Sequence, residues 1–319
     1  TGEEAARIGE ALGSLEATLK QAGEEWCAAP FGSLPSTLRA RGSDVDVTCL
    51  CRRGLPAGQT AAGLLAEKIG PLFRDHPRFK VLEEVLQARV PILKLRFDDQ
   101  LDVDLSCQNT RALQNTRLLR GYAGLDERVR SLVVAVKLWA KAAGVCGASG
   151  GRLSSYSFTL LAIYFMQVDR EVALPILPVD AFREEPYAGQ DNERIVAECR
   201  GRWSCSLSTA QLLERFFLFY HGRLWTGEEV VSVRFGKRLA AARPEFERLR
   251  GRHAQRLHIE DPFILERNLN CVLGGRQEAE LRRAFAEAAD GLRAGSLPAG
   301  LRADAPAPAA LPPQGRAEG

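Results

Sequence analysis

Two aspartates with one residue between them, Asp44 and Asp46, are the first residues whose types and spacing could support chemistry. Residues 44–49 alternate polar and apolar side chains and are rich in β-branched types, which predicts a strand with both carboxylates on one face. Adjacent carboxylates repel, and a divalent cation that prefers oxygen ligands would compensate them. A turn at Gly32-Ser33 suits close approach of phosphate oxygens. The combination predicts metal-assisted phosphoryl or nucleotidyl transfer.

A second predicted strand, residues 101–107, supplies a further carboxylate. Its apolar residues occupy alternate positions, and Asp102, Asp104 and Ser106 occupy the positions between them. If this strand lies beside the first, one of its aspartates completes a three-carboxylate metal site. Alternation alone leaves Asp102 and Asp104 equivalent, because both lie on the same face. An isolated Asp-x-Asp is more often a solvated strand face, so the prediction depends on these partners.

Candidate phosphate and base contacts follow in a helical part of the chain. The predicted helix 126–143 carries Lys137 and Lys141, which are neighbours because they lie one turn apart. They form either a solvated basic edge or a site for a triphosphate. Ser155 and Tyr156 lie at the start of the next helix, where free backbone N–H groups favour anions. Tyr156 is either a core aromatic or a platform for a base.

Composition limits the class of protein. The 319 residues are 45% hydrophobic and carry a net charge of +3 from 43 basic and 40 acidic residues. That balance excludes a protein that coats duplex nucleic acid by charge alone. Eight scattered cysteines without a CxxC pair, and only four histidines, predict reduced thiols in a reducing compartment rather than a zinc site. We expect a soluble protein that binds no membrane, since no apolar run is long enough to span one.

The predicted elements favour an α+β chain of about two domains. Strands are expected near 44–49, 79–87, 89–97 and 101–107, and helices near 3–22, 60–70, 126–143, 153–168, 208–220 and 278–292. These elements predict a catalytic domain over residues 1–112, a mostly helical domain over 113–293 in which 180–206 is a loop or insertion, and a disordered tail over 294–319.

A series of short motifs resembles one family. In order, they are Phe-Gly-Ser, Gly-Ser-Asp-Val-Asp, Val-Pro-Ile-Leu-Lys, Val-Asp-Leu-Ser, Asn-Thr-Arg-Leu-Leu, Val-Lys-Leu-Trp-Ala-Lys, Leu-Ser-Ser-Tyr and Glu-Asp-Pro-Phe. Over about residues 30 to 275, this order resembles the non-canonical poly(A) polymerases and terminal uridylyltransferases, which are polymerase-β-like nucleotidyltransferases. Small size and the Leu-Pro-Ile-Leu-Pro tract are most similar to the small kinetoplastid uridylyltransferases, in particular a mitochondrial one of an editosome-like complex.

The resemblance implies a polymerase-β-like nucleotidyltransferase domain with a mixed sheet and helices, a mostly helical second domain, and an active-site cleft between them. It implies template-independent transfer of UMP from UTP to the 3′-hydroxyl of single-stranded or 3′-overhang RNA, with two Mg²⁺ or Mn²⁺ ions. It further implies a mitochondrial location and an RNA-editing protein complex as partner.

The resemblance also assigns residues. Asp44, Asp46 and, in preference to Asp102, Asp104 match the catalytic metal ligands, with Asp104 as the general base. Ser33 and Ser155 match phosphate contacts, Asn115 and Thr116 lie near ribose and base, Tyr156 stacks on the base, and Asp261 lies near its edge. The full set of implied nucleotide-binding residues is Gly32, Ser33, Asn115, Thr116, Lys137, Lys141, Ser155, Tyr156, Asp261 and Arg267.

Two positions depart from the family pattern and bear on base choice. Uridylyltransferases of the family usually carry Glu three residues after the base-edge aspartate, where this chain has Ile264. A histidine that selects uracil in some relatives matches Arg267. If UTP is selected, Asp261 with Arg267, or ordered water, must hold the uracil edge. The alternatives are a non-canonical poly(A) polymerase and an inactive RNA-binding subunit, although inactive relatives usually lose a metal carboxylate and this chain keeps all three.

Overall fold

The computed structural model describes residues 2–40, 42–55, 58–183, 191–222, 226–249 and 256–301. The chain divides into two compact units. The first comprises Thr1–Arg130 and Leu177–Arg202, and the second comprises Ser131–Ile176 and Trp203–Gly319. The chain therefore returns to the first unit after leaving it, which a single predicted boundary after residue 112 does not describe. The expected cleft between the domains stays a prediction.

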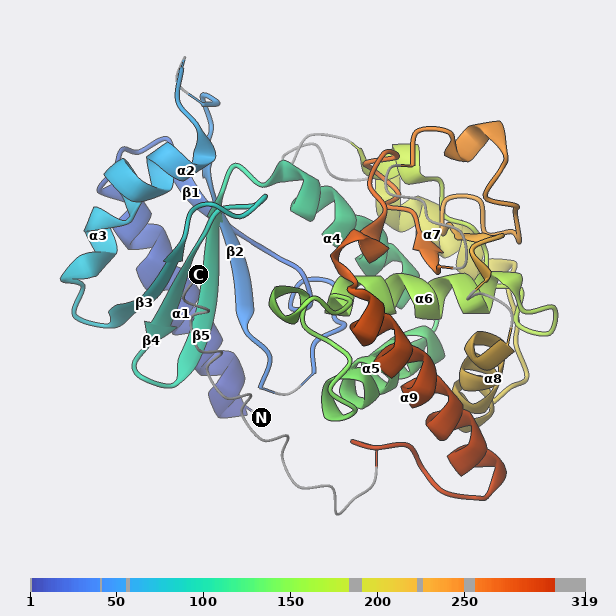
Figure 1. Cartoon of the computed structure of the whole chain (residues 1–319). Coiled ribbons are helices and arrows are strands. Elements are labelled where there is room, and N and C mark those ends of the chain that lie inside the picture. Colours follow the sequence, from blue (N-terminus) through green and yellow to red (C-terminus); the bar gives the residue numbers. More distant parts are fainter. Residues whose placement is uncertain are drawn as a thin grey trace. The chain divides into compact units, whose positions relative to one another are not determined.

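A five-stranded mixed sheet forms the centre of the first unit (Figure 1). In spatial order the strands are β1 (Trp26–Phe31), β2 (Val45–Cys51), β5 (Leu101–Cys107), β4 (Ile92–Phe97) and β3 (Phe79–Val85). Strands β2 and β5 are parallel neighbours, and the other adjacent pairs are antiparallel. All four predicted strands are present, and β1 is an additional strand that the pattern did not indicate.

The two faces of the central strands differ in character. On β2, Val45, Val47 and Cys49 are fully buried in one core cluster with apolar residues of helix α1 (Gly2–Lys20). The cluster also includes residues of α2 (Ala61–Leu64), the π-helical η1 (Leu65–Ile69) and α3 (Pro71–Arg74). Thr60 caps the first turn of α2, as predicted. Because side chains alternate along a strand, Asp46 lies on the opposite face, which these helices leave uncovered.

Three further helical segments belong to the first unit: α4 (Thr110–Ala123), η3 (Val179–Phe182) and α7 (Asp191–Gly201). The last two correct the expected loop over 180–206, of which residues 184–190 lie outside the described residues. α7 has few apolar side chains, so its sequence does not show the period of an amphipathic helix. It is held by the buried Val196 and by a hydrogen bond from Arg200 to the Gly124 carbonyl of α4.

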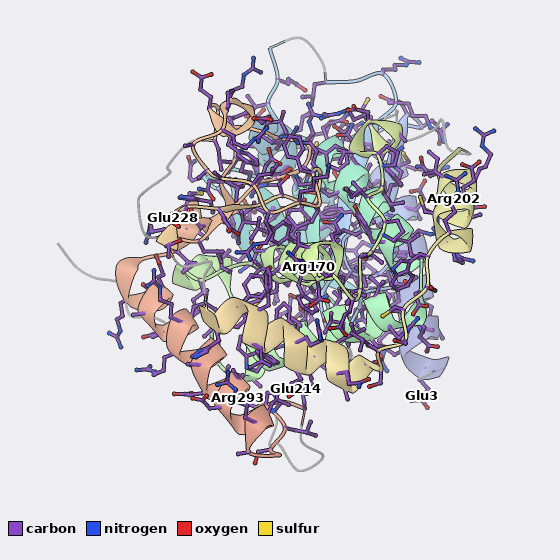
Figure 2. The ribbon with its side chains drawn as sticks, turned by 90° about the vertical axis from the view of Figure 1, so that its right-hand side faces the viewer. Glu3, Arg170, Arg202, Glu214, Glu228 and Arg293 are labelled. Atoms are coloured by element: carbon purple, nitrogen blue, oxygen red, sulfur yellow. The ribbon has the colours of Figure 1, made fainter. Side chains whose placement is uncertain are left out.

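Helix α5 (Glu127–Ala142) crosses from the first unit to the second, which is mostly helical. In the second unit, α8 and α9 lie side by side (Figures 1 and 2). Trp139 of α5 packs against Phe217 and Phe285, with ring centroids 4.7 and 4.8 Å away, so it is a core residue. The other elements of the unit are η2 (Ala148–Gly150), α6 (Ser155–Val168), α8 (Thr209–Gly222), β6 (Val230–Val231), η5 (Pro244–Phe246), β7 (His258–Ile259), η6 (Leu269–Val272) and α9 (Gly275–Arg293).

The last predicted segment, 294–319, is only partly covered. Residues 294–301 form turns after α9, and residues 302–319 lie outside the described residues. Across the part of the chain that the structure describes, no helix has both the length and the apolar character needed to cross a bilayer.

Candidate functional site

The parallel register of β2 and β5 brings two of the predicted carboxylates together. Asp46 lies directly opposite Asp104, on the sheet face that the core helices do not cover. Asp44 is exposed and lies two residues before Asp46. Burial and, after it, the negative charge of Asp44 raise the pKa of Asp104 to about 6. Asp44 is therefore close enough to Asp104 to repel its charge, and the three carboxylates form one acidic cluster.

The register also separates Asp104 from Asp102, which the alternation pattern had left equivalent. Asp102 lies opposite Arg96 of β4, whose Nε and Nη2 donate to its two carboxylate oxygens at 2.7 and 3.2 Å. Its charge is thus compensated within the sheet. Asp104 lies opposite Lys94, whose Nζ donates instead to Glu83 at 2.7 Å. Asp104 is therefore the carboxylate left to act with Asp44 and Asp46.

The acidic cluster fits a hard divalent cation by its donor chemistry. Within the described ranges, no three His, Cys, Asp or Glu side chains converge into a ready metal cage. Mg²⁺ rarely uses such a cage, because it keeps several waters and is held by one or two carboxylates with substrate phosphates. Burial first, and the charge of Asp44 second, disfavour the ionised form of Asp104, and a bound cation would offset both effects.

The predicted Gly-Ser turn follows β1 and lies against the acidic cluster. Gly32 has a φ of +74°, and a Cβ at this position would overlap the Asp46 carboxylate. Only glycine meets both conditions without strain. The Ser36 hydroxyl donates to the Gly32 carbonyl at 2.7 Å, and the partly buried Ser33 follows Gly32. A hollow of about 390 Å³ includes Asp44 and Asp102 in its lining, but neither Gly32 nor Ser33.

Asn115 and Thr116 extend the site from α4 within the same unit. Asn115 Oδ1 is buried and has no hydrogen-bond partner among the residues that the structure describes. Thr116 Oγ1 accepts the Gly32 N–H at 2.8 Å and donates to the Ala112 carbonyl at 2.7 Å. The structure therefore joins Thr116 to the turn, whereas Asn115, the preceding residue of α4, has a buried acceptor without a partner among the described residues.

In the second unit, the predicted phosphate contacts gather where α5 ends and α6 begins. Burial raises the pKa of the Cys146 thiol, whereas the charges of Lys137 and Lys141 lower it, so both lysines lie near Cys146. A β-bridge pairs Cys146 with Leu153, immediately before the first turn of α6. There Ser154 caps the helix by accepting the Ser157 N–H, and Ser155 is exposed.

The predicted base contacts form a second group in that unit. Asp261 is fully buried, and its Oδ1 accepts the N–H groups of Phe263 and Ile264 at 3.0 and 3.1 Å. Its Oδ2 accepts from Arg267 Nη1 at 3.3 Å. Burial raises the pKa of Tyr156, the charge of Asp261 raises it further and that of Arg267 lowers it, so the tyrosine lies near both. Asp261 thus shapes the loop and orients Arg267.

The ion pair between Arg234 and Glu260, next to this loop, was not predicted from the sequence. Glu260 is 1% exposed, and it accepts from Arg234 at 2.5 Å and from the Ser232 hydroxyl at 2.5 Å. The Glu-Asp-Pro-Phe motif contains Glu260, but Arg234 and Ser232 come from a distant segment without a motif of their own. Only the three-dimensional packing shows that they support the loop that begins at Asp261.

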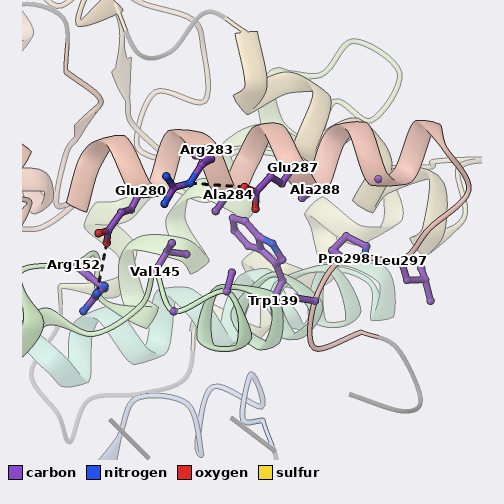
Figure 3. Close-up of a pocket in the computed structure, with 14 residues that line it drawn as sticks. Trp139, Val145, Arg152, Glu280, Arg283, Ala284, Glu287, Ala288, Leu297 and Pro298 are labelled. Atoms are coloured by element: carbon purple, nitrogen blue, oxygen red, sulfur yellow. Dashed lines mark ion pairs between the residues drawn. The ribbon is translucent and has the colours of Figure 1, made fainter. Parts of the chain in front are cut away.

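A pocket of about 520 Å³ in the second unit is separate from all of these groups (Figure 3). It lies along α9 above Trp139, and its wall carries the ion pairs Arg152–Glu280 and Arg283–Glu287. None of the predicted site residues lines it.

The mixed sheet and its acidic cluster define a polymerase-β-like nucleotidyltransferase. A solved structure of the Cid1 poly(U) polymerase with Mg and 3′-dATP superposes with a TM-score of 0.74 at 25% identity, over 94% of this chain and 92% of that one. A structure of Cid1 with its short product ApU gives 0.72 at 26% identity, over 94% and 91%. These likenesses confirm the predicted fold class.

Comparisons of sequence agree. The family described as "Poly(A) RNA polymerase, mitochondrial-like, central palm domain" matches residues 1–124. Human terminal uridylyltransferase 7 is 31% identical over 276 residues, 80% of this chain and only 17% of that protein. Terminal uridylyltransferase cid1 of Schizosaccharomyces pombe is 27% identical over 310 residues, 90% of this chain and 74% of that protein. In sequence the chain is therefore similar to terminal uridylyltransferases over most of its length, and over residues 1–124 to the palm domain of poly(A) RNA polymerases.

Proposed function

We propose that the protein is a template-independent RNA terminal uridylyltransferase. The observation that carries the proposal is the register pairing of Asp46 with Asp104 beside Asp44 on one sheet face. The RNA 3′-hydroxyl oxygen attacks the α-phosphorus of UTP, the bond to the β-phosphate breaks, and pyrophosphate leaves. Asp104 takes the hydroxyl proton, for which a carboxylate with a pKa of about 6 is suited. Magnesium at this cluster would lower the pKa of the hydroxyl and neutralise the leaving group.

Each unit offers groups that suit a nucleotide. Asn115 Oδ1 offers a buried acceptor whose missing partner costs about 1–3 kcal/mol, and a ribose hydroxyl can donate to it. Lys137, Lys141 and Ser155 offer two ammonium groups and a hydroxyl for the triphosphate. Tyr156 offers an aromatic ring for the base.

Base selection is assigned to Arg267. Asp261 fixes one edge of its guanidinium, which is a donor only. Uracil presents the acceptor O4, whereas adenine and cytosine present amino groups at the corresponding positions. An arginine there favours uracil and disfavours adenine and cytosine, and this gives the chain a route to the uracil edge that does not need a glutamate at position 264.

The test offers each of the four triphosphates separately with labelled single-stranded RNA. We expect UTP to be preferred. A good side-chain contact to a base discriminates by about 1–3 kcal/mol, so Arg267→Gln should lower the UTP-to-ATP ratio about tenfold. Arg267→Lys, which keeps a donor-only side chain, should retain the preference. Wild-type preference for ATP would overturn the uridylyl assignment, and an unchanged ratio in Arg267→Gln would overturn the role of Arg267.

A poly(A) polymerase is the second candidate. Poly(A) RNA polymerase cid11 of S. pombe is 32% identical over 267 residues, 80% of this chain and 52% of that protein. The four-triphosphate assay separates the two activities directly. We disfavour an inactive RNA-binding subunit, because all three carboxylates are present and two are paired in register.

The substrate and setting of the enzyme extend the proposal. Cid1 structures hold a UTP analogue and the product ApU, which supports UTP and an RNA 3′ end as substrates. Single-stranded or 3′-overhang RNA, a mitochondrial location and an RNA-editing complex as partner rest on the resemblance of motifs alone. Fractionation of cells that express the tagged protein, followed by identification of co-purifying proteins, would test the location and the partner.

A further inference from the structure

The hydroxyl of Thr116 connects helix α4 to the turn that touches the acidic cluster. Thr116 is 6% exposed and lies in the second turn of α4. Its Oγ1 donates to Ala112 O at 2.7 Å and accepts from Gly32 N at 2.8 Å, both ordinary lengths for good hydrogen bonds. The contact spans 84 positions in the sequence and stays within the first unit.

Gly32 is held from three sides. Its N–H is fixed by Thr116, and its carbonyl accepts the Ser36 hydroxyl at 2.7 Å. Its Cα faces the Asp46 carboxylate so closely that a Cβ would overlap an Asp46 oxygen. A displacement of Gly32 therefore changes the space available to a carboxylate of the acidic cluster and also moves Ser33, the next residue.

We propose that Thr116 is a positioning residue, whose hydroxyl holds the Gly32 turn against Asp46. This role is additional to the place near ribose and base that the family resemblance implied. The hydroxyl donates its one proton to the Ala112 carbonyl and accepts the Gly32 N–H, so toward a ribose it can act only as an acceptor. The expected effect of Thr116 on catalysis rests on the proposed function, whereas its expected effect on the Gly32 turn does not.

The first experiment measures the turn without any reaction. Wild type, Thr116→Val and Thr116→Ser are compared by hydrogen exchange over peptides that contain Gly32, and by binding of Mn²⁺ to the protein alone. Valine preserves shape but removes the hydroxyl, and serine keeps it. We expect Thr116→Val to exchange about tenfold faster at Gly32 and to bind Mn²⁺ several-fold more weakly, with Thr116→Ser close to wild type. Equal exchange and equal Mn²⁺ binding in all three proteins would overturn the proposal.

The second experiment separates positioning from direct contact. Single-nucleotide addition is measured with UTP, 2′-deoxy-UTP and 3′-deoxy-UTP. If Thr116 positions the turn, Thr116→Val lowers kcat/KM for both deoxy analogues as well as for UTP, because the Gly32 turn does not depend on a ribose hydroxyl. A loss that disappears entirely with either deoxy analogue assigns the whole effect to a ribose contact and overturns the proposal. If wild type transfers no nucleotide, the proposed function fails, and the exchange and Mn²⁺ measurements still decide the role of Thr116.

Discussion

Replacing Asp104 by asparagine should stabilise the fold while it abolishes catalysis. The pKa of this carboxyl rises from an ordinary 3.8 to about 6 in the fold, chiefly through burial. Because the pKa is higher in the fold, protonation of Asp104 stabilises the folded state. This stabilisation is complete at pH values below the ordinary pKa of 3.8, and it is lost as the pH rises through about 6. At pH 7.5 the ionised carboxylate therefore opposes folding. The shift corresponds to about 3 kcal/mol, and partial exposure to solvent reduces this to about 1–2 kcal/mol.

The assay is urea unfolding of wild type and Asp104→Asn in EDTA at pH 7.5 and pH 4.5. We expect the variant to be more stable by about 1–2 kcal/mol at pH 7.5, and the gain to shrink at pH 4.5, where wild-type Asp104 is largely protonated in the fold. Asp102→Asn is the matched control. It breaks the ion pair with Arg96 at the surface, so it should give no gain in stability.

Magnesium adds a second arm to this test. An ion that binds only the folded state stabilises it by mass action. Addition of Mg²⁺ should therefore stabilise wild type much more than Asp104→Asn. The reasoning is refuted if Asp104→Asn is less stable than wild type at pH 7.5, or if the difference between them does not change with pH.

Two further predictions concern other parts of the chain. Lys137→Met and Lys141→Met should each raise the KM for UTP about tenfold or more without unfolding the protein, because the lysines are assigned to the triphosphate; a KM that is unchanged in both variants contradicts that assignment. His76 Nδ1 accepts the backbone N–H groups of Arg78 and Phe79, and burial, then the charge of Arg78, lowers its pKa. The contribution of His76 to stability should therefore be complete above pH 6.5 and fall as acid protonates His76 in the unfolded chain. Relative to its value at pH 7.5, the urea midpoint at pH 5.5 should be higher in His76→Gln than in wild type. An identical change with pH in the two proteins would contradict this.

The sequence predicted much of the first unit because its strands alternate clearly. Residues 101–107 show both faces of β5, and Thr60 shows where α2 begins. The choice between Asp102 and Asp104 could not come from that pattern, because both lie on one face. It depends on which residue of the next strand lies opposite each of them, and register is a property of the folded sheet.

Contacts between segments that are distant in the sequence could not be predicted from the pattern of polar and apolar residues either. The hydrogen bond between Thr116 and Gly32, and the ion pair between Arg234 and Glu260, join residues that no spacing rule connects. The pattern did not indicate α7, because most of its side chains are polar and its apolar residues Ile195, Val196 and Ala197 are consecutive, which gives no helical period. Local patterns thus indicated the strands and the acidic pair, whereas packing decided the partners of each side chain.

The most direct test of the central claim is extension of labelled RNA by wild type and Asp44→Ala in the presence of UTP and Mg²⁺. Asp44 is exposed, so its replacement should leave the fold intact, which circular dichroism can verify. The account predicts that wild type extends RNA with a free 3′-hydroxyl, that it fails to extend 3′-deoxy-terminated RNA, and that Asp44→Ala loses the activity. Undiminished extension by Asp44→Ala, or extension by wild type in EDTA, would contradict it.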